Sequence, residues 1–409
     1  MSPDLLGRLQ KLRDPSPTAC LYAARALRDF GDGFVAVLLP VYLTILGLGA
    51  FEIGVVATLA LLGSALMTLG IGLLGSRTSL RRLLVVAAML MTVTGIAFAS
   101  SSTMAVILLV AFVGTINPSS GSVSIFAPLE HAILSRSVTD ADRTRMFARY
   151  SLIGSLAAAL GALGSASPDF LATLGLSQIT AIKAMFLVYA ALGVAGGLLY
   201  ACLPAASSTC ENEPVAALGP SRGIVYKMAA LFSIDSFGGG FAVQSLVALW
   251  LFNKFGLSLS AAGLFFFWTG VLSAFSFPVA AWLSKRIGLV NTMVFTHMPS
   301  SLCLILAAVV PNVEMALALL LTRAALSQMD VPTRSSYVMA VVTPPERPAA
   351  ASFTTVPRSI AAAVSPAIAG ALFAAGYEAW PLIICGVFKI LYDIALLWTF
   401  RHVRPPEEQ

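Results

Sequence analysis

Apolar residues occur in continuous runs of about twenty along nearly the whole chain, and short polar segments separate the runs. A helix needs about 20 predominantly apolar residues to cross a bilayer, whereas a membrane β-barrel shows alternating segments of roughly ten residues. The pattern therefore predicts an all-α membrane protein. The twelve predicted spans are 22–46, 51–75, 82–100, 104–135, 147–166, 180–203, 226–252, 259–283, 290–310, 313–342, 352–375 and 379–400.

Two of these spans are longer than a crossing requires, and each contains residues that interrupt a helix. The span 104–135 contains Asn117-Pro118 and Gly121, and the span 313–342 contains Pro332. Proline removes a backbone donor and clashes with the preceding turn. Both spans are therefore expected to be discontinuous.

A small, polar and proline-containing segment lies between the sixth and seventh spans, which is typical of a linker. The predicted organisation has five parts: an amphipathic cytoplasmic N-terminus (1–21), an N-terminal six-helix bundle (22–203), a cytoplasmic linker (204–225), a C-terminal six-helix bundle (226–400) and a cytoplasmic tail (401–409).

Composition supports this class of protein. Of the 409 residues, 58% are hydrophobic and 11% are charged, against about 25% charged in a typical soluble domain. The positions of the basic residues behind the net charge of +6 indicate the topology. Cytoplasmic loops of membrane proteins are enriched in Lys and Arg. With the N-terminus inside, the predicted outer loops contain a single basic residue, Lys254. The basic residues of the inner loops and the tail are then Arg77, Arg81, Arg82, Arg136, Arg143, Arg145, Lys227, Lys285, Arg286, Arg347, Arg401 and Arg404. Both termini are thus expected in the cytoplasm, with no nucleic-acid partner.

The two halves of the chain resemble each other at a nearly constant offset, which indicates a duplicated six-helix unit in parallel topology. At an offset of 209 residues, Gly47, Gly54, Leu74 and Arg77 match Gly256, Gly263, Leu283 and Arg286. At an offset of 207, Phe30-Gly31 and Gly33-Phe34 match Phe237-Gly238 and Gly240-Phe241. Lys183 matches Lys389 at an offset of 206, and Pro128 matches Pro332 at an offset of 204.

Twelve spans in two halves, a central linker and a basic loop after the second span resemble the major facilitator superfamily. The superfamily's loop signature is G-x-L-x-D-R-x-G-R-[RK]-x-x-L, and the residues that fit it are Gly72, Leu74, Arg77, Arg81 and Leu84, with Arg286 in the second copy. Ser76 stands at the position of the signature Asp. The resemblance implies two pseudo-symmetric bundles, alternating access to a central cavity, and a conformational role for this loop.

Charges within the membrane concentrate in the four spans that the resemblance places around the cavity, namely the first, fourth, seventh and tenth. Such charges usually face a bundle interior or a water-filled path. They are Arg25, Arg28, Asp29 and Asp32; Glu130 and His131; Asp235; and Arg323, Asp330 and Arg334.

The repeat aligns Arg28 with Asp235 and Glu130 with Arg334. A basic–acidic combination in the first half thus becomes an acidic–basic one in the second half, at similar predicted depth. We therefore predict two pseudo-symmetric ion pairs, Arg28–Glu130 and Asp235–Arg334, each joining two helices.

Three acids, Asp29, Asp32 and Asp330, have no counterpart in the other half. A carboxylate without a partner in a low-dielectric cavity can exchange a proton near neutral pH. Asp32 and Asp330 are therefore the preferred candidates for proton coupling or cation binding. A structural role for Asp32, and pairing of Asp330 with Arg323 two turns earlier, remain open alternatives.

Other polar and aromatic residues are expected to support the scaffold. Lys389 can pair with Asp393 one helical turn later, and His297 is expected to be hydrogen-bonded within its bundle. His131 adjoins Glu130 but points in another direction on a helix. The aromatic run 265–268 is expected to face lipid, with one or two rings reaching the cavity.

The favoured function is secondary active transport of a small solute by alternating access, specifically proton-coupled export (antiport) of a drug-like or amphipathic metabolite. One alternative is a ferroportin-like divalent-metal exporter with Asp32, Glu130 and His131 as ligands; another is an organic-anion transporter. A sensor without transport is disfavoured, and an enzyme is not expected, because the sequence contains no H-E-x-x-H and only three histidines. The expected setting is a monomer in a bacterial inner membrane, with no cofactor beyond a coupling proton.

Overall fold

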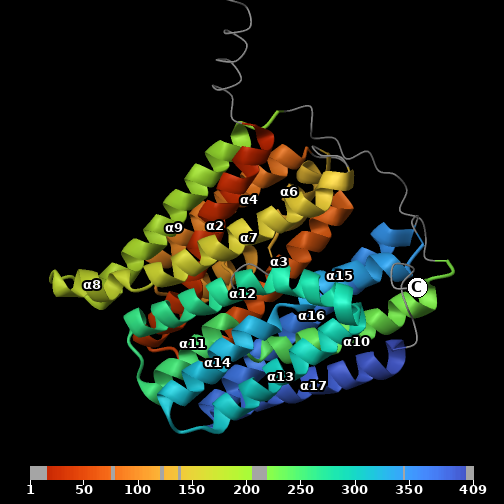
Figure 1. Cartoon of the computed structure of the whole chain (residues 1–409). Helices are drawn as coiled ribbons and strands as arrows, with labels where there is room; N and C mark the ends of the chain where they lie inside the picture. The colour runs from red at the N-terminus through yellow and green to blue at the C-terminus, as the bar shows by residue number, and fades with distance from the viewer. Residues whose placement is uncertain are drawn as a thin grey trace, which may run out of the picture.

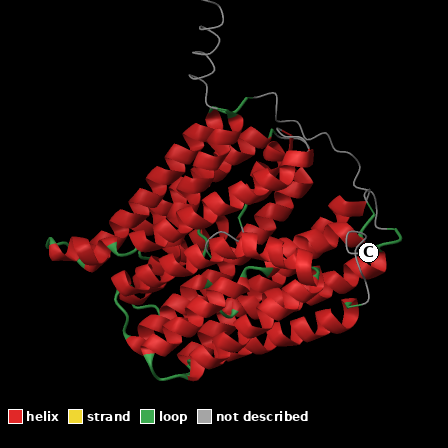
Figure 2. Ribbon diagram, in the orientation of Figure 1, coloured by secondary structure: helices red, strands yellow, loops and turns green. Residues whose placement is uncertain are grey.

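The computed structural model describes residues 16–74, 79–119, 124–136, 140–204, 219–343 and 346–401. Figure 2 shows that these residues form helices joined by loops. The helices of the first half are α2 (Pro17–Ile45), α3 (Ala50–Leu74), α4 (Leu80–Ser100), α5 (Met104–Val113), α6 (Phe126–Arg136), α7 (Asp140–Gly164), α8 (Ser167–Thr173) and α9 (Gln178–Ala201). Those of the second half are α10 (Arg222–Gly240), α11 (Gln244–Phe255), α12 (Leu259–Ile287), α13 (Leu289–Val309), α14 (Val313–Ser327), α15 (Asp330–Val341), α16 (Arg347–Ala374) and α17 (Trp380–Phe400).

Helices occupy every predicted span, and nine helical stretches of the described residues are long and apolar enough to cross a membrane. The first span, α2, is 29 residues long but falls outside this set because its four charged residues lower its apolar character. The fourth span divides into α5 and α6, and the tenth divides into α14 and α15. The predicted interruptions of these two spans are therefore confirmed, while the total of twelve spans stays a prediction.

The two halves have the same internal packing. In the first half α2 packs against α7 and α9, α4 against α9, and α3 against α5; in the second half α10 packs against α16 and α17, α13 against α17, and α12 against α14. Figure 1 shows the halves as two neighbouring helical bundles. This correspondence is the one that a duplicated six-helix unit predicts.

Matched glycines make matched turns. Gly47 follows α2 with φ 85°, and Gly256 follows α11 with φ 62°. Both values lie in the left-handed region, which only glycine adopts without strain. The offset of 209 residues thus reflects a shared backbone requirement at the end of the first span of each half.

A second matched pair, Gly33 and Gly240, permits close packing of helices. A Cβ at Gly33 would collide with the backbone of Ala158 in α7, and a Cβ at Gly240 would collide with Ala362 in α16. Close approach of backbones at small residues is a common basis of helix association in membranes. The two glycines therefore position the first helix of each half against its fifth.

Gly33→Ala should lower the free energy of unfolding by about 1–3 kcal/mol, because the added methyl group has no room against α7. Thermal unfolding of the purified protein in detergent measures the effect. Gly70→Ala is the matched control, since a Cβ at Gly70 in α3 meets no atom within 4 Å. Equal unfolding midpoints for the two variants would contradict this account of Gly33.

The halves contact each other at the ends of the helices that the charge pattern places outside the cell. Thr58 in α3 accepts a hydrogen bond from the Ala367 amide in α16 (2.9 Å). Asp169 in α8 accepts bonds from the Ser260 amide (2.9 Å) and hydroxyl (2.8 Å) at the start of α12. In Figure 1, α6 and α15 lie apart at the opposite end. The described contacts between the halves are therefore present at the outer end of the helices.

The predicted cytoplasmic segments are described only in part. The N-terminus up to residue 15, most of the linker and the tail beyond Arg401 lie outside the described residues. The end of the linker contacts the second half, because Glu346 accepts hydrogen bonds from the Gly219 amide and from the Thr343 hydroxyl (2.6 Å). Hydrogen bonds from Ser221, Thr343 and Gly219 lower the pKa of Glu346 to about 2.

Candidate functional site

A cavity of about 560 Å³ lies between the two halves, within the range of known small-molecule sites. Its lining combines hydroxyl groups, such as Ser236 and Thr269, with the rings of Phe265, Phe266 and Phe277. The charged side chains of the described lining are Arg25, Asp29, Asp235, Arg323, Asp330, Arg334, Arg358 and Lys389. Five of these are cationic and three are carboxylates, so the lining carries an excess of positive charge.

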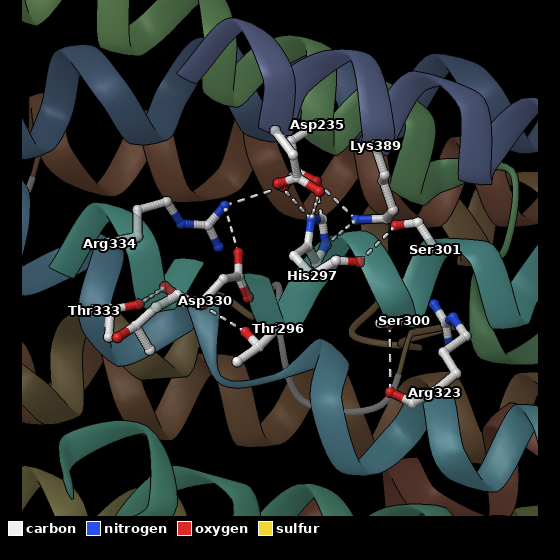
Figure 3. A network of polar contacts seen from close by, with 12 residues as sticks. Asp235, Thr296, His297, Ser300, Ser301, Arg323, Asp330, Thr333, Arg334 and Lys389 are labelled. Atoms are coloured by element: carbon white, nitrogen blue, oxygen red, sulfur yellow. Dashed lines mark hydrogen bonds and ion pairs between the residues drawn. The ribbon is translucent and has the colours of Figure 1, made fainter. Parts of the chain in front are cut away.

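Asp235 in α10 is the centre of an ion network in the second half (Figure 3). Its Oδ2 lies 3.0 Å from Nη1 of Arg334 in α15, which is the predicted pair. Its Oδ1 lies 2.7 Å from Nζ of Lys389 in α17. Arg334 also lies 3.4 Å from Oδ2 of Asp330, one turn earlier in α15. One carboxylate thus holds two cations from different helices.

His297 in α13 extends this network toward α17. Its Nδ1 lies 3.0 Å from Oδ1 and 3.1 Å from Oδ2 of Asp393. Its Nε2 lies 3.3 Å from Nζ of Lys389 and 3.8 Å from Oδ1 of Asp235. All these groups are buried or half-buried.

The predicted pairing of Lys389 with Asp393 is wrong. The spacing of four residues allows it, but Asp393 is fully buried against His297, and α10 brings Asp235 to the lysine instead. A signal was present in the sequence, since a lysine within an apolar span requires a counter-charge. The helix alone could not indicate which acid supplies it.

The first half contains a corresponding ion pair, and neither of its two charged residues lines the cavity. Arg28 Nη1 lies 3.0 Å from Oε2 of Glu130, as predicted. Glu130 also accepts hydrogen bonds from the hydroxyls of Tyr200 (2.6 Å) and Tyr150. Glu130 is 0% exposed, and neither it nor Arg28 is among the described residues that line the cavity.

Asp29 and Asp32 have different environments. Asp29 lines the cavity and has two cationic neighbours, with Oδ2 2.6 Å from Nε of Arg25 and Oδ1 3.4 Å from Nε of Arg28. Asp32 is 2% exposed, does not belong to the described lining, and accepts a hydrogen bond from the Tyr189 hydroxyl (3.3 Å). A coupling role for Asp32 stays a prediction, with a scaffold tyrosine as its neighbour.

Asp330 pairs with Arg334 and not with Arg323. A spacing of seven residues places two side chains on one face only if the helix is continuous. Here α14 ends at Ser327 and α15 begins at Asp330, so this spacing no longer applies. The interruption between α14 and α15 therefore separates Arg323 from Asp330, and the alternative pairing of these two residues is wrong.

Arg323 in α14 and Arg358 in α16 line the cavity without a counter-charge. Neither guanidinium forms an ion pair or a side-chain hydrogen bond with the part of the chain that the structure describes. In Figure 3, no dashed line joins the Arg323 guanidinium to the Asp235 network. These two cations account for the positive excess of the lining.

The alternative metal site is not assembled. His131 lines the cavity, and its ring packs at 4.8 Å from the Phe147 ring and 4.9 Å from the Tyr150 ring. Within the described ranges, no group of three or more His, Cys, Asp or Glu residues is close enough to hold a metal ion. The set Asp32, Glu130 and His131 is therefore wrong as a ligand group, because the three side chains face different surroundings.

The loop motif is only partly visible. Arg77 lies outside the described residues, Gly72 lies in the last turn of α3, and Arg81 lies in the first turn of α4. Arg286, in the last turn of α12, lies over the Trp282 ring at 4.3 Å. A conformational role for the motif stays a prediction.

The chain is similar to several known proteins over nearly its full length. It is 23% identical over 416 residues to a Saccharomyces cerevisiae protein described as "Uncharacterized membrane protein YJR124C", with 93% of each chain covered. Its fold matches a bacterial homologue of the human lysosomal transporter Spinster in an inward-facing, unoccupied conformation (TM-score 0.71, 14% identity, 94% and 96% covered). It also matches the human organic anion transporter MFSD10 (TM-score 0.66, 14% identity, 93% and 100% covered).

These relatives come from yeast, bacteria and human, so they do not single out a bacterial inner membrane. The chain is an integral multi-pass membrane protein without enzymatic function. The profile described as "Major Facilitator Superfamily" matches residues 21–223 and 228–409. The protein therefore belongs to the major facilitator superfamily of transporters.

Proposed function

We propose that this transporter carries a small organic anion through the central cavity by alternating access. The observation that supports the proposal is the pair Arg323 and Arg358, which face the cavity without a counter-charge. The other charged groups of the described lining have partners of opposite sign.

A bound anion would lower the free-energy cost of holding the Arg323 and Arg358 guanidinium groups without a counter-charge. Arg323 and Arg358 are half-buried. A cation partly withdrawn from water is costly without a partner, and the cost falls when an opposite charge with good hydrogen-bond geometry is supplied. Guanidinium groups match carboxylate, sulfonate and phosphate oxygens through parallel N–H bonds. The substrate's anionic group is therefore the partner that Arg323 and Arg358 lack.

The rest of the lining favours an amphipathic anion. Phe265, Phe266 and Phe277 offer apolar surface close to hydroxyl groups, so an aromatic or aliphatic body can be buried while the charged end is held. The sequence led us to expect an amphipathic solute, and the proposal adds that this solute is negatively charged. The structurally similar human MFSD10 is described as an organic anion transporter, which is compatible with the proposal.

Matched aromatic probes test the proposal in proteoliposomes. Benzenesulfonate is permanently anionic, benzyl alcohol is neutral and benzylamine is cationic, so the three differ mainly in the charge of one group. We expect protein-dependent benzenesulfonate uptake that benzoate and phenyl phosphate compete with and the other two probes do not. Uptake in right-side-out and inverted vesicles also tests the predicted export direction.

Arg323→Gln and Arg358→Gln should each reduce benzenesulfonate uptake at low concentration about tenfold or more, because each removes a charge-assisted hydrogen bond. Thermal stability should be unchanged or higher, since a half-buried cation without a counter-charge is lost. Arg222→Gln is the matched control, because Arg222 is exposed and stacks on Tyr226. Uptake that all three arginine variants retain, or equal uptake of benzylamine, would refute an anion site.

A further inference from the structure

A second cavity, of about 400 Å³, lies between the two halves at the outer end of the helices. The first half contributes the end of α2 with residues of α8 and α9, and the second half contributes the end of α11 and the start of α12. In Figure 1, this is the end at which α8 projects from the first half. We infer that this outer cavity binds a small organic ammonium ion, and that the bound amine holds the outer ends of the two halves together.

Asp169 in α8 supplies the charge of the outer cavity, since no other charged residue belongs to its described lining. Its Oδ2 accepts hydrogen bonds from the amide (2.9 Å) and the hydroxyl (2.8 Å) of Ser260, in the first turn of α12. A carboxylate at this end of a helix is also favoured by the helix dipole. Oδ1 has no hydrogen-bond or ion-pair partner among the described residues. One oxygen of Asp169 thus joins the two halves, and the other is available to a ligand.

The rest of the lining suits the body of a small amine. Leu249, Phe252 and Leu259 offer apolar surface close to the carboxylate. Gln178 and Asn253 add amide groups and are exposed, so a ligand can enter from the outer aqueous phase. The volume lies within the range of known small-molecule sites, which combine apolar walls with a few polar groups. An ammonium group with an aromatic or aliphatic body therefore fits the chemistry of this cavity.

The charge around the outer cavity also favours a cation. The acids of the predicted outer loops are Glu52, Asp169, Glu314 and Glu378, against the single base Lys254. The Lys254 ammonium already donates to the carbonyls of Ala308 (2.8 Å) and Val310 (3.0 Å). A surface with an excess of one sign raises the local concentration of ions of the other sign.

The outer cavity differs from the central cavity in both position and sign. The described linings of the two cavities share no residue. The central lining has a positive excess, whereas the only charge of the outer lining is a carboxylate. The ligand of the outer cavity is therefore a different compound from the anion proposed for the central one.

Occupation of the outer cavity has a conformational consequence. Because both halves form its walls, these walls separate when the halves move apart at this end. A ligand that contacts both walls binds the joined state more tightly and shifts the population toward it. A transporter must open this end to exchange its solute with the outside, so the bound amine should slow transport. This effect is independent of which solute crosses the membrane.

Equilibrium binding of tritiated 3-phenylpropylamine to the full-length protein in nanodiscs tests the site. We expect saturable binding that the uncharged analogue 3-phenylpropan-1-ol does not displace. Asp169→Asn should weaken binding about fivefold or more, because the ion pair with the ammonium is lost. The amide oxygen of this variant can still accept the bonds from Ser260. Glu314→Gln is the matched control, since Glu314 is an exposed acid in the first turn of α14 and does not belong to the described lining.

A second variant tests the position of the bound amine without changing Asp169. Asn253→Trp places a large ring in the outer cavity at an exposed residue that does not belong to the described lining of the central cavity. It should abolish saturable binding. Unchanged affinity in Asp169→Asn or in Asn253→Trp, equal displacement by the alcohol, or no saturable binding to the wild type would overturn the site.

Distances between spin labels test the conformational effect. Leu174→Cys and Tyr377→Cys, in a background with the five native cysteines replaced by serine, place labels at exposed outer positions of different halves. We expect saturating 3-phenylpropylamine to raise the ratio of short to long label distances about twofold or more, and Asp169→Asn to remove this effect. A distance distribution that the amine leaves unchanged would overturn the conformational role. A wild type that binds the amine but takes up no benzenesulfonate would refute the proposed function and leave the amine site standing.

Discussion

Asp235→Asn should destabilise the protein by about 3–5 kcal/mol, the typical cost of leaving a buried charge without its partner. The reason is geometric: a single carboxylate lies 3.0 Å from Arg334 and 2.7 Å from Lys389, so its loss affects two cations. Arg334 retains Asp330 at 3.4 Å, but among the described residues Lys389 retains only the imidazole of His297. Thermal unfolding in detergent, followed by tryptophan fluorescence, measures the change.

The double variant Asp235→Asn/Lys389→Gln provides the control, because it removes one anion and one cation together. It should recover at least half of the stability that Asp235→Asn loses. A double variant less stable than the single variant would show that Lys389 contributes to stability through something other than its charge. The contact with Asp235 would then not be the dominant one for this lysine.

Arg28→Gln should destabilise the first half to a similar extent, about 3–5 kcal/mol, because Glu130 is 0% exposed and would lose its cationic partner. The hydroxyls of Tyr150 and Tyr200 would remain as its donors. A double-mutant cycle with Glu130→Gln, read by thermal unfolding, should give a coupling energy of about 2 kcal/mol or more. Additive effects of the two changes would contradict a direct pair.

The charge exchange Arg28→Glu/Glu130→Arg should restore stability only in part. The new glutamate would lie next to Asp29, whose Oδ1 is 3.4 Å from the present Arg28 Nε. Anion selectivity should not change in any folded variant of this pair, since neither residue belongs to the described cavity lining. Altered competition among benzenesulfonate, benzoate and phenyl phosphate would show that the pair influences the cavity after all.

The repeat is the reason that the two ion pairs could be predicted from sequence. Aligning the halves fixes the relative depth of residues on different helices, which no single span can provide. The same alignment relates Gly33 to Gly240 and Gly47 to Gly256, and the structure gives each pair a common backbone role. Hydrophobic runs located the helices, and proline-containing segments located the interruptions of the fourth and tenth spans.

The partners of Lys389 and Asp330 could not be predicted from the sequence, and the reason differs between the two residues. Spacing along one helix suggested Asp393 for Lys389, but an approaching helix, α10, supplied a nearer acid. Spacing also suggested Arg323 for Asp330, but the helix ends between the two residues. In both cases local periodicity competed with tertiary arrangement, and the tertiary arrangement determined the contact. The unpartnered state of Arg323 and Arg358 is likewise a property of the assembled cavity.

The Arg28–Glu130 pair lies outside the cavity lining, whereas Asp235 and its partners belong to it, and this difference affects which substitutions can alter substrate binding. Charges that line the cavity in the second half can be altered with direct effects on what is bound, whereas the pair inside the first half has no surface toward a substrate. Selection for a different substrate, or for resistance to a cavity-blocking compound, should therefore accumulate substitutions at residues that line the cavity, which include Arg25 and Asp29 of the first half. Changes around Glu130 should instead be recovered as temperature-sensitive alleles.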